Sequence, residues 1–252
     1  MIIGSMNNPH KDLMKEVAWV AKHFDFLDLT LEVPMATPET INVKVVKASL
    51  KNFPVVGHTG WYLPIGSPFE ELRVYAINEY AKCARVFSAL GVEYVNVHFD
   101  TSMPMKKEKH TIDFNVWTLR RLIAVGKKYG VKVLVENTGG TFSRPSVLNY
   151  VFKKVPKLFF HLDIGHANIG EENQTPLLVR RFFKKIVHIH VSDNNGKGDQ
   201  HLPIGRGNIK WDETLKTVKD SGYDNTITLE VLTTSSARLA DKSKLRKIWD
   251  NL

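Results

Sequence analysis

Residues 158–166 read LFFHLDIGH, a short apolar run that ends in Asp163 and is followed three residues later by His166. Seven other short apolar runs along the chain end in the same way, in a polar or ionisable residue. Segments with helical periodicity separate these runs, so strand and helix alternate throughout. Eight such units, with right-handed crossovers between parallel strands, are enough to close a barrel. We therefore predict one (β/α)8 TIM barrel over residues 1–252, with strands at 1–4, 26–32, 55–58, 94–98, 131–136, 158–163, 186–190 and 226–230.

The helical patterns and the loops agree with this prediction. An open, doubly wound sheet also alternates strands and helices, but it gathers functional residues at one switch point rather than at many strand ends. No glycine-rich phosphate fingerprint follows a strand in the sequence, which argues against a nucleotide-binding enzyme. The clearest helices are expected at 13–23, 69–90, 114–129 and 211–221, and the longest loops after strands at 59–68, 100–111 and 192–209.

Composition sets limits on the class of protein. The chain has 252 residues, of which 43% are hydrophobic and 24% charged, enough to bury a large core. It contains neither the roughly 18 uninterrupted apolar residues of a membrane span nor a signal-peptide pattern, so we expect a cytoplasmic protein without a membrane partner. The net charge of +9 favours anionic partners, but the basic residues are spread over amphipathic helix faces. The single cysteine, Cys83, is interpreted as a buried helix residue.

The residues that end the strands form the candidate site. In a barrel, the carboxyl ends of all strands meet at one face, so these side chains should converge. A carboxylate that ends an apolar strand must be paired, coordinated or raised in pKa. Carboxylate and imidazole together suit Mn²⁺, Mg²⁺, Co²⁺ or Zn²⁺. We predict a metal site from Glu136, Asp163, His190 and Glu230, with His58, His98, His166, Asp199 and His201 as additional candidate ligands.

At these residues the chain resembles the xylose isomerase-like barrel superfamily, which contains sugar isomerases, sugar epimerases and endonuclease IV. The resemblance covers nearly the whole chain, and it is specific for the superfamily rather than for one reaction. It rests on five motifs, VEN at 135–137, LDIGH at 162–166, HIHVSD at 188–193, DQHLPIGRGNI at 199–209 and LEV at 229–231.

The epimerase and isomerase branch implies one divalent metal on the four-residue set. On this resemblance Glu136 and Glu230 are the catalytic acid and base, one removing a proton beside a ketose carbonyl and the other returning it. The metal is implied to act as a Lewis acid. The partner would be a small-molecule sugar or sugar phosphate. The residues expected to contact the sugar are Glu32, Trp61, Asn137, His166 and Arg206.

The endonuclease IV branch implies up to three zinc ions, held by all nine candidate ligands, and DNA with abasic sites as the substrate. Trp61 and Tyr62 would then act as wedges into the duplex. Two loops differ from that nuclease: residues 138–142 read TGGTF in place of an Ala-Gly-Gln-Gly type loop, and 32–34 read EVP in place of a longer polar segment. We therefore place sugar isomerase or epimerase ahead of nuclease, and a homo-oligomer stays open beside a monomer.

Overall fold

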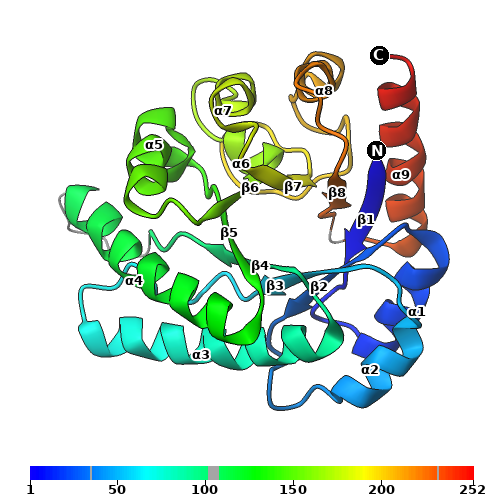
Figure 1. Ribbon diagram of the computed structural model, residues 1–252. Helices are drawn as coiled ribbons and strands as arrows, with labels where there is room; N and C mark the ends of the chain where they lie inside the picture. Colours follow the sequence, from blue (N-terminus) through cyan, green and yellow to red (C-terminus); the bar gives the residue numbers. More distant parts are fainter. Residues whose placement is uncertain (35, 102–107, 232) are drawn as a thin grey trace.

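The computed structural model describes residues 1–34, 36–101, 108–231 and 233–252. Its centre is a closed barrel of eight parallel strands that follow one another in chain order (Figure 1). The last strand pairs with the first, with Ile2 opposite Thr226 and Ser5 opposite Leu229. The predicted TIM barrel is confirmed. The strands are β1 (Ile2–Met6), β2 (Leu27–Leu31), β3 (Val55–Thr59), β4 (Tyr94–His98), β5 (Lys132–Glu136), β6 (Phe159–Asp163), β7 (Ile186–Val191) and β8 (Thr226–Leu229).

Helices form the outer layer of the barrel (Figure 1). One of them, α4, begins at Glu108 rather than at the expected residue 114. Its first turn is polar and is held by ion pairs of Glu108 with Arg144 and of Lys109 with Asp113. Because the turn lacks the regular spacing of apolar residues that predicts a helix, the sequence did not indicate it. Within the described ranges, no helix is both long and apolar enough to cross a membrane. The helices are α1 (Leu13–His23), α2 (Val43–Leu50), α3 (Glu70–Leu90), α4 (Glu108–Tyr129), η1 (Gly140–Ser143), α5 (Pro145–Lys154), α6 (Ile164–Ala167), α7 (Thr175–Phe182), α8 (Trp211–Asp220) and α9 (Ser235–Asp250).

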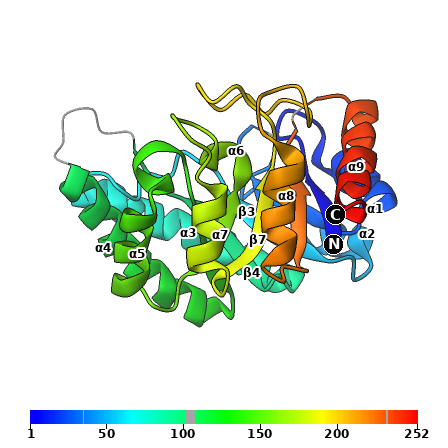
Figure 2. The same ribbon diagram turned by 90° about the horizontal axis from the view of Figure 1, so that it is seen from above.

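The long loops lie at one end of the barrel. Figure 2 shows the segment between β7 and α8, in gold, standing above the strands on the same side as α6. The loop expected at 192–209 therefore lies at the C-terminal ends of the strands, where barrel enzymes carry their active sites. We call this end the mouth. Of the loop expected at 100–111, residues 102–107 lie outside the described residues.

Successive side chains of each strand point alternately to the helices and to the barrel interior. In β6, Phe160 and Leu162 belong to the apolar core, whereas the ring of His161 lies 4.0 Å from that of His190 on β7. The floor of the barrel is apolar, because the ring of Phe26 fills the space beside Gly4, where a Cβ atom would lie 2.4 Å from that ring. The interior between this floor and the mouth is polar, and it holds the candidate site.

Candidate metal centre

Four strand ends bring four metal-binding side chains to one point at the mouth. Glu136 and Asp163 end β5 and β6, His190 lies near the end of β7, and Glu230 directly follows β8. One ligand atom of each lies within 4.8 Å of those of the other three. All four residues are buried, with exposed fractions between 0% and 6%. The structure thus brings together the four-residue set expected from the sequence.

Each of these four residues also has one buried side-chain atom that makes no hydrogen bond. Glu136 Oε1, Asp163 Oδ2, His190 Nδ1 and Glu230 Oε2 are buried and have no hydrogen-bond partner. Such atoms are rare in folded proteins, because leaving a buried polar group unpaired is costly. A divalent cation would satisfy all four at once. Three carboxylates and one imidazole suit Mn²⁺, Mg²⁺, Co²⁺ or Zn²⁺, so the donor set fits a metal of this class.

The pKa values of the carboxyl groups reflect how closely their negative charges are packed. Burial raises the pKa of Asp163 to about 7, and repulsion from Glu136 and Glu230 adds to this effect. Burial also acts on Glu230, but the imidazoles of His190 and His201 outweigh it and lower its pKa to about 2. Opposite shifts in neighbouring groups are typical of functional sites. The arrangement requires positive charge, from protonated histidines or from a metal ion.

A second group of ligands shares Glu136 with the first. The Nε2 atoms of His58 and His98 lie 3.4 Å apart, and their rings are stacked with centroids 4.9 Å apart. Glu136 Oε2 lies 3.1 Å from His98 Nε2 and 3.7 Å from His58 Nε2. These three residues are close enough to hold an ion of their own.

A third group lies on the loops above the mouth. Asp199 Oδ2 lies 3.1 Å from His166 Nε2 and 2.9 Å from His201 Nε2. His166 reaches this position because the Asp163 side chain caps α6, accepting a hydrogen bond from the His166 backbone N–H. His201 has a left-handed backbone with φ of 45°, which is uncommon outside glycine and clusters at functional sites. All nine candidate ligands therefore surround one mouth.

A cavity of about 380 Å³ opens at the mouth. Glu32, Trp61 and His166 line it, as the sequence suggested for substrate contacts, and Trp61 is 67% exposed. Asn137 is turned away, since its amide is bonded on both sides to the backbone of Asp163. Arg206 is exposed and does not line the cavity. Within the described part of the chain, no lysine or arginine lines it, and the lining that the sequence did not indicate includes Met6, Pro9, His10, Phe99 and Thr138.

Three polar residues inside the barrel were missed by sequence reasoning. Asp28, Asn96 and His161 have exposed fractions of at most 1%. Asn96 Nδ2 donates a hydrogen bond of 2.6 Å to Glu136 Oε2, and His161 Nδ1 lies 3.2 Å from the same oxygen. Asn96 and His161 each precede a candidate ligand by two residues, which places them on the same strand face as that ligand. This two-residue spacing was the available signal.

Three comparisons relate the chain to known proteins. The family model described as xylose isomerase-like TIM barrel matches residues 17–248. An uncharacterized protein of Methanocaldococcus jannaschii is 31% identical over 199 residues, which cover 71% of this chain and 67% of that protein. A probable endonuclease 4 of Aquifex aeolicus is 26% identical over 230 residues, 80% of this chain and 79% of that protein. The crystal structure of a D-tagatose 3-epimerase-like protein matches with a TM-score of 0.88 and 26% identity, covering 100% of this chain and 98% of the other.

Proposed function

The chain belongs to the family of xylose isomerase-like TIM barrels, and on that premise we propose that it is a divalent-metal-dependent epimerase or isomerase of a small ketose. The observation that carries this proposal is the convergence at the mouth of four buried ligand atoms that make no hydrogen bond. That the chain is an enzyme is confirmed by its similarity to the epimerase-like protein. The metal would be held by Glu136, Asp163, His190 and Glu230.

Glu136 and Glu230 are the proposed acid–base pair. They reach the mouth from β5 and from the end of β8, with β6 and β7 between them. When bound, the metal would supply Lewis acidity to the ketose carbonyl and the adjacent hydroxyl. One glutamate, as the carboxylate, would then remove the proton from the carbon beside the carbonyl, leaving an enediolate, and the other, which must carry a proton in the sugar complex, would return one. Return to the opposite face inverts the carbon.

Glu136 is ionised at neutral pH, as a general base must be. Burial opposes ionisation of Glu136, but the imidazoles of His98 and His161 outweigh it and hold its pKa well below the ordinary value. The hydrogen bond from Asn96 Nδ2 orients the same carboxylate. Glu136 is therefore positioned and charged for proton abstraction.

The lining of the cavity favours a neutral sugar over an anionic substrate. A phosphate group is normally held by lysine, arginine or backbone N–H groups. In the described part of the mouth, the lining offers histidines and the carboxylates of Glu32, Asp199 and Glu230, but no lysine or arginine. Carboxylates accept hydrogen bonds from sugar hydroxyls and repel phosphate. We therefore place an unphosphorylated ketose ahead of a ketose phosphate.

One observation favours a second candidate, a zinc-dependent nuclease acting on abasic DNA. All nine ligands implied by the resemblance to endonuclease IV surround the mouth, and two of their three groups, the four-residue set and His58, His98 and Glu136, are compact enough to hold an ion each. The probable endonuclease 4 of Aquifex aeolicus aligns over 80% of the chain. In the described part of the mouth, the lining has no lysine or arginine to hold phosphates, which weighs against DNA.

The metal content of protein purified without chelator tests both candidates. We expect about one Mn²⁺, Mg²⁺, Co²⁺ or Zn²⁺ per chain, measured by elemental mass spectrometry against amino-acid analysis. The loaded protein should then interconvert ketose epimers and lose this activity on chelation. About three zinc ions per chain, together with cleavage of abasic DNA and no ketose turnover, would replace the epimerase with the nuclease.

A further inference from the structure

Asp28 is a fully buried carboxylate that lies outside the nine predicted ligands. It is the second residue of β2 and points into the barrel interior, with an exposed fraction of 0%. Its Oδ2 accepts a hydrogen bond of 2.7 Å from His190 Nε2, and further bonds of 3.0 Å from His188 Nε2 and Thr228 Oγ1. Its Oδ1 has no hydrogen-bond partner and lies 3.6 Å from His58 Nδ1. Asp28 therefore faces two candidate ligands from two different groups.

The bond to His190 decides which nitrogen of that ring is available. A neutral imidazole has one N–H, and Nε2 must carry it in order to donate to Asp28. Nδ1 then keeps its lone pair. This atom lies 3.1 Å from Glu230 Oε2 and is one of the four atoms of the metal centre that make no hydrogen bond. A carboxylate behind a metal-binding imidazole orients the ring and increases its basicity.

His58 has the opposite tautomer from His190. Its Nε2 accepts a hydrogen bond of 3.1 Å from Asn96 Nδ2 and lies 3.4 Å from His98 Nε2, at the second ligand group. The N–H of the neutral ring is therefore on Nδ1, which faces Asp28 Oδ1. One carboxylate thus stands behind two imidazoles, with Oδ2 behind His190 and Oδ1 behind His58.

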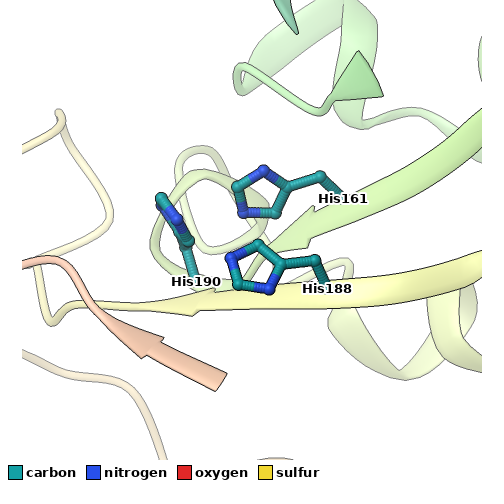
Figure 3. Close-up of side chains that lie close together, drawn as sticks. All are labelled: His161, His188 and His190. Carbon is teal, nitrogen blue, oxygen red and sulfur yellow. The ribbon is translucent and has the colours of Figure 1, made fainter. Parts of the chain in front are cut away.

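The neighbouring histidines do not form a competing metal position. His161, His188 and His190 are close enough to share an ion, and Figure 3 shows their rings gathered between β6 and β7. Both nitrogens of His188 are already bonded, Nδ1 to Thr226 Oγ1 at 2.7 Å and Nε2 to Asp28. An ion bound through the Nε2 atoms would have to break the bonds to Asp28. Intact, these bonds make His188 a support for the carboxylate.

We propose that Asp28 is the positioning residue of the metal centre, which holds His190 and His58 in the tautomers that present a lone pair to the mouth. This inference rests on the metal centre of the proposed function and adds the residue that sets its affinity. Loss of such a supporting carboxylate typically weakens metal binding about 10- to 100-fold.

Nitrogen NMR of the unaltered chain tests the tautomers directly. Protein labelled with ¹⁵N-histidine and loaded with Zn²⁺ should show the proton of His190 on Nε2 and that of His58 on Nδ1. The signals are assigned by their loss in His190→Gln and His58→Gln. A proton on Nδ1 of His190 in the loaded wild type would overturn the proposal. A merely structural role of Asp28 would not select one tautomer at both rings.

Metal affinity gives the second readout, followed as the absorption of Co²⁺ titrated into metal-stripped protein. Asp28→Asn should raise the Kd about 10- to 100-fold. The matched control is Asp241→Asn, which alters a carboxylate that is 5% exposed, lies on α9 and accepts a hydrogen bond from Ile204 N. Its Kd should stay within about twofold of wild type. If Asp28→Asn does not fold, Thr228→Val removes one of the three bonds to Oδ2 and should shift the Kd in the same direction.

The Co²⁺ titrations distinguish a failure of the proposed metal centre from a failure of the proposed role of Asp28. A wild type that binds no Co²⁺ would overturn the metal centre and Asp28's role together. A folded Asp28→Asn variant with the wild-type Kd, beside a wild type that binds Co²⁺, would overturn the role of Asp28 alone.

Discussion

The two ends of the barrel carry cavities of opposite chemistry. The cavity at the mouth, of about 380 Å³, is lined by carboxylates and imidazoles. A larger cavity, of about 580 Å³, lies where β5, β6 and β7 begin, and its lining in the described part of the chain has no carboxylate and no imidazole. Chemistry rather than size therefore marks the reacting end. We call this second cavity the basic end. Its basic residues are Arg120, Lys127, Lys132, Lys157, Lys184 and Lys185.

The cations of the basic end support the scaffold. Lys127 lies in the last turn of α4, where a positive charge offsets the partial negative charge of the helix terminus. Lys185 Nζ donates to the backbone oxygens of Pro156 and Leu158 at 2.9 and 3.0 Å. Much of the positive charge thus lies away from the mouth. The net charge of +9 is therefore a poor guide to the substrate.

The largest effect should follow from changing the glutamates of the mouth. Glu136→Gln and Glu230→Gln each remove a carboxylate that we propose transfers a proton, so kcat for ketose epimerisation should fall about 10²- to 10⁴-fold. Chromatographic separation of the epimers would measure this on metal-loaded protein. Near-normal turnover in either variant would mean that the altered glutamate of the mouth is not needed for the reaction.

Substitution of His58 and His201 should show whether the reaction needs only the four-residue metal site or all nine candidate ligands. Neither residue belongs to the four-residue set, so in a one-ion epimerase His58→Ala and His201→Ala should lower kcat roughly tenfold or less. Each variant should also keep the wild-type metal content by elemental analysis. Loss of an ion together with loss of abasic-DNA cleavage would instead extend the working site to all nine ligands.

The free energy of unfolding should depend on pH through the protonation of His201 at the mouth. Burial opposes protonation of His201, but Glu230 and Asp199 outweigh it and raise its pKa to about 10. The folded protein then holds this proton more tightly than the unfolded chain. The stabilisation is complete below about pH 6.5, the ordinary histidine pKa, and is lost as the pH rises towards 10. Urea unfolding of the chelated protein should show this decline in wild type and a weaker one in His201→Gln; equal declines would exclude His201 as its source.

The smallest effect is expected at the basic end. Lys127→Gln combined with Lys184→Gln removes two of its charges without touching the mouth. The value of kcat should stay within about twofold of wild type, and the free energy of unfolding should change by about 0.5 kcal/mol or less per substitution. A tenfold fall in kcat with intact folding would mean that the basic end takes part in the reaction.

The candidate ligands at the strand ends could be predicted from sequence for a geometric reason. All strand ends of a closed parallel barrel meet at one face, so recognising the alternation of strands and helices was enough to bring Glu136 and Glu230 together. The loop residues Asp199 and His201 were candidates because a carboxylate and an imidazole stand two residues apart, but that spacing does not indicate where the loop folds. Asn137 shows the limit of a motif, since only the structure reveals that its amide is bonded to the backbone of Asp163.

Asp28 could not be found in this way. It stands inside an apolar run, and its histidine partners lie 160 and 162 residues further along the chain. Contacts across the interior depend on the register and closure of the whole barrel, which a single sequence does not state. His161 differs, because its two-residue spacing from Asp163 places it on the same strand face, although its position beside Glu136 follows from the pairing of β5 with β6.

The bonds to Asp28 join parts of the chain that a ribosome makes far apart in time. Asp28 is synthesised early, whereas Thr228, which donates to the same oxygen, follows 200 residues later. A nascent chain therefore carries an unsupported carboxylate, and its ligand histidines lack their orientation, until β7 and β8 have been made and docked. The chain would therefore be able to bind its metal ion only after all eight strands have been synthesised and the barrel has closed.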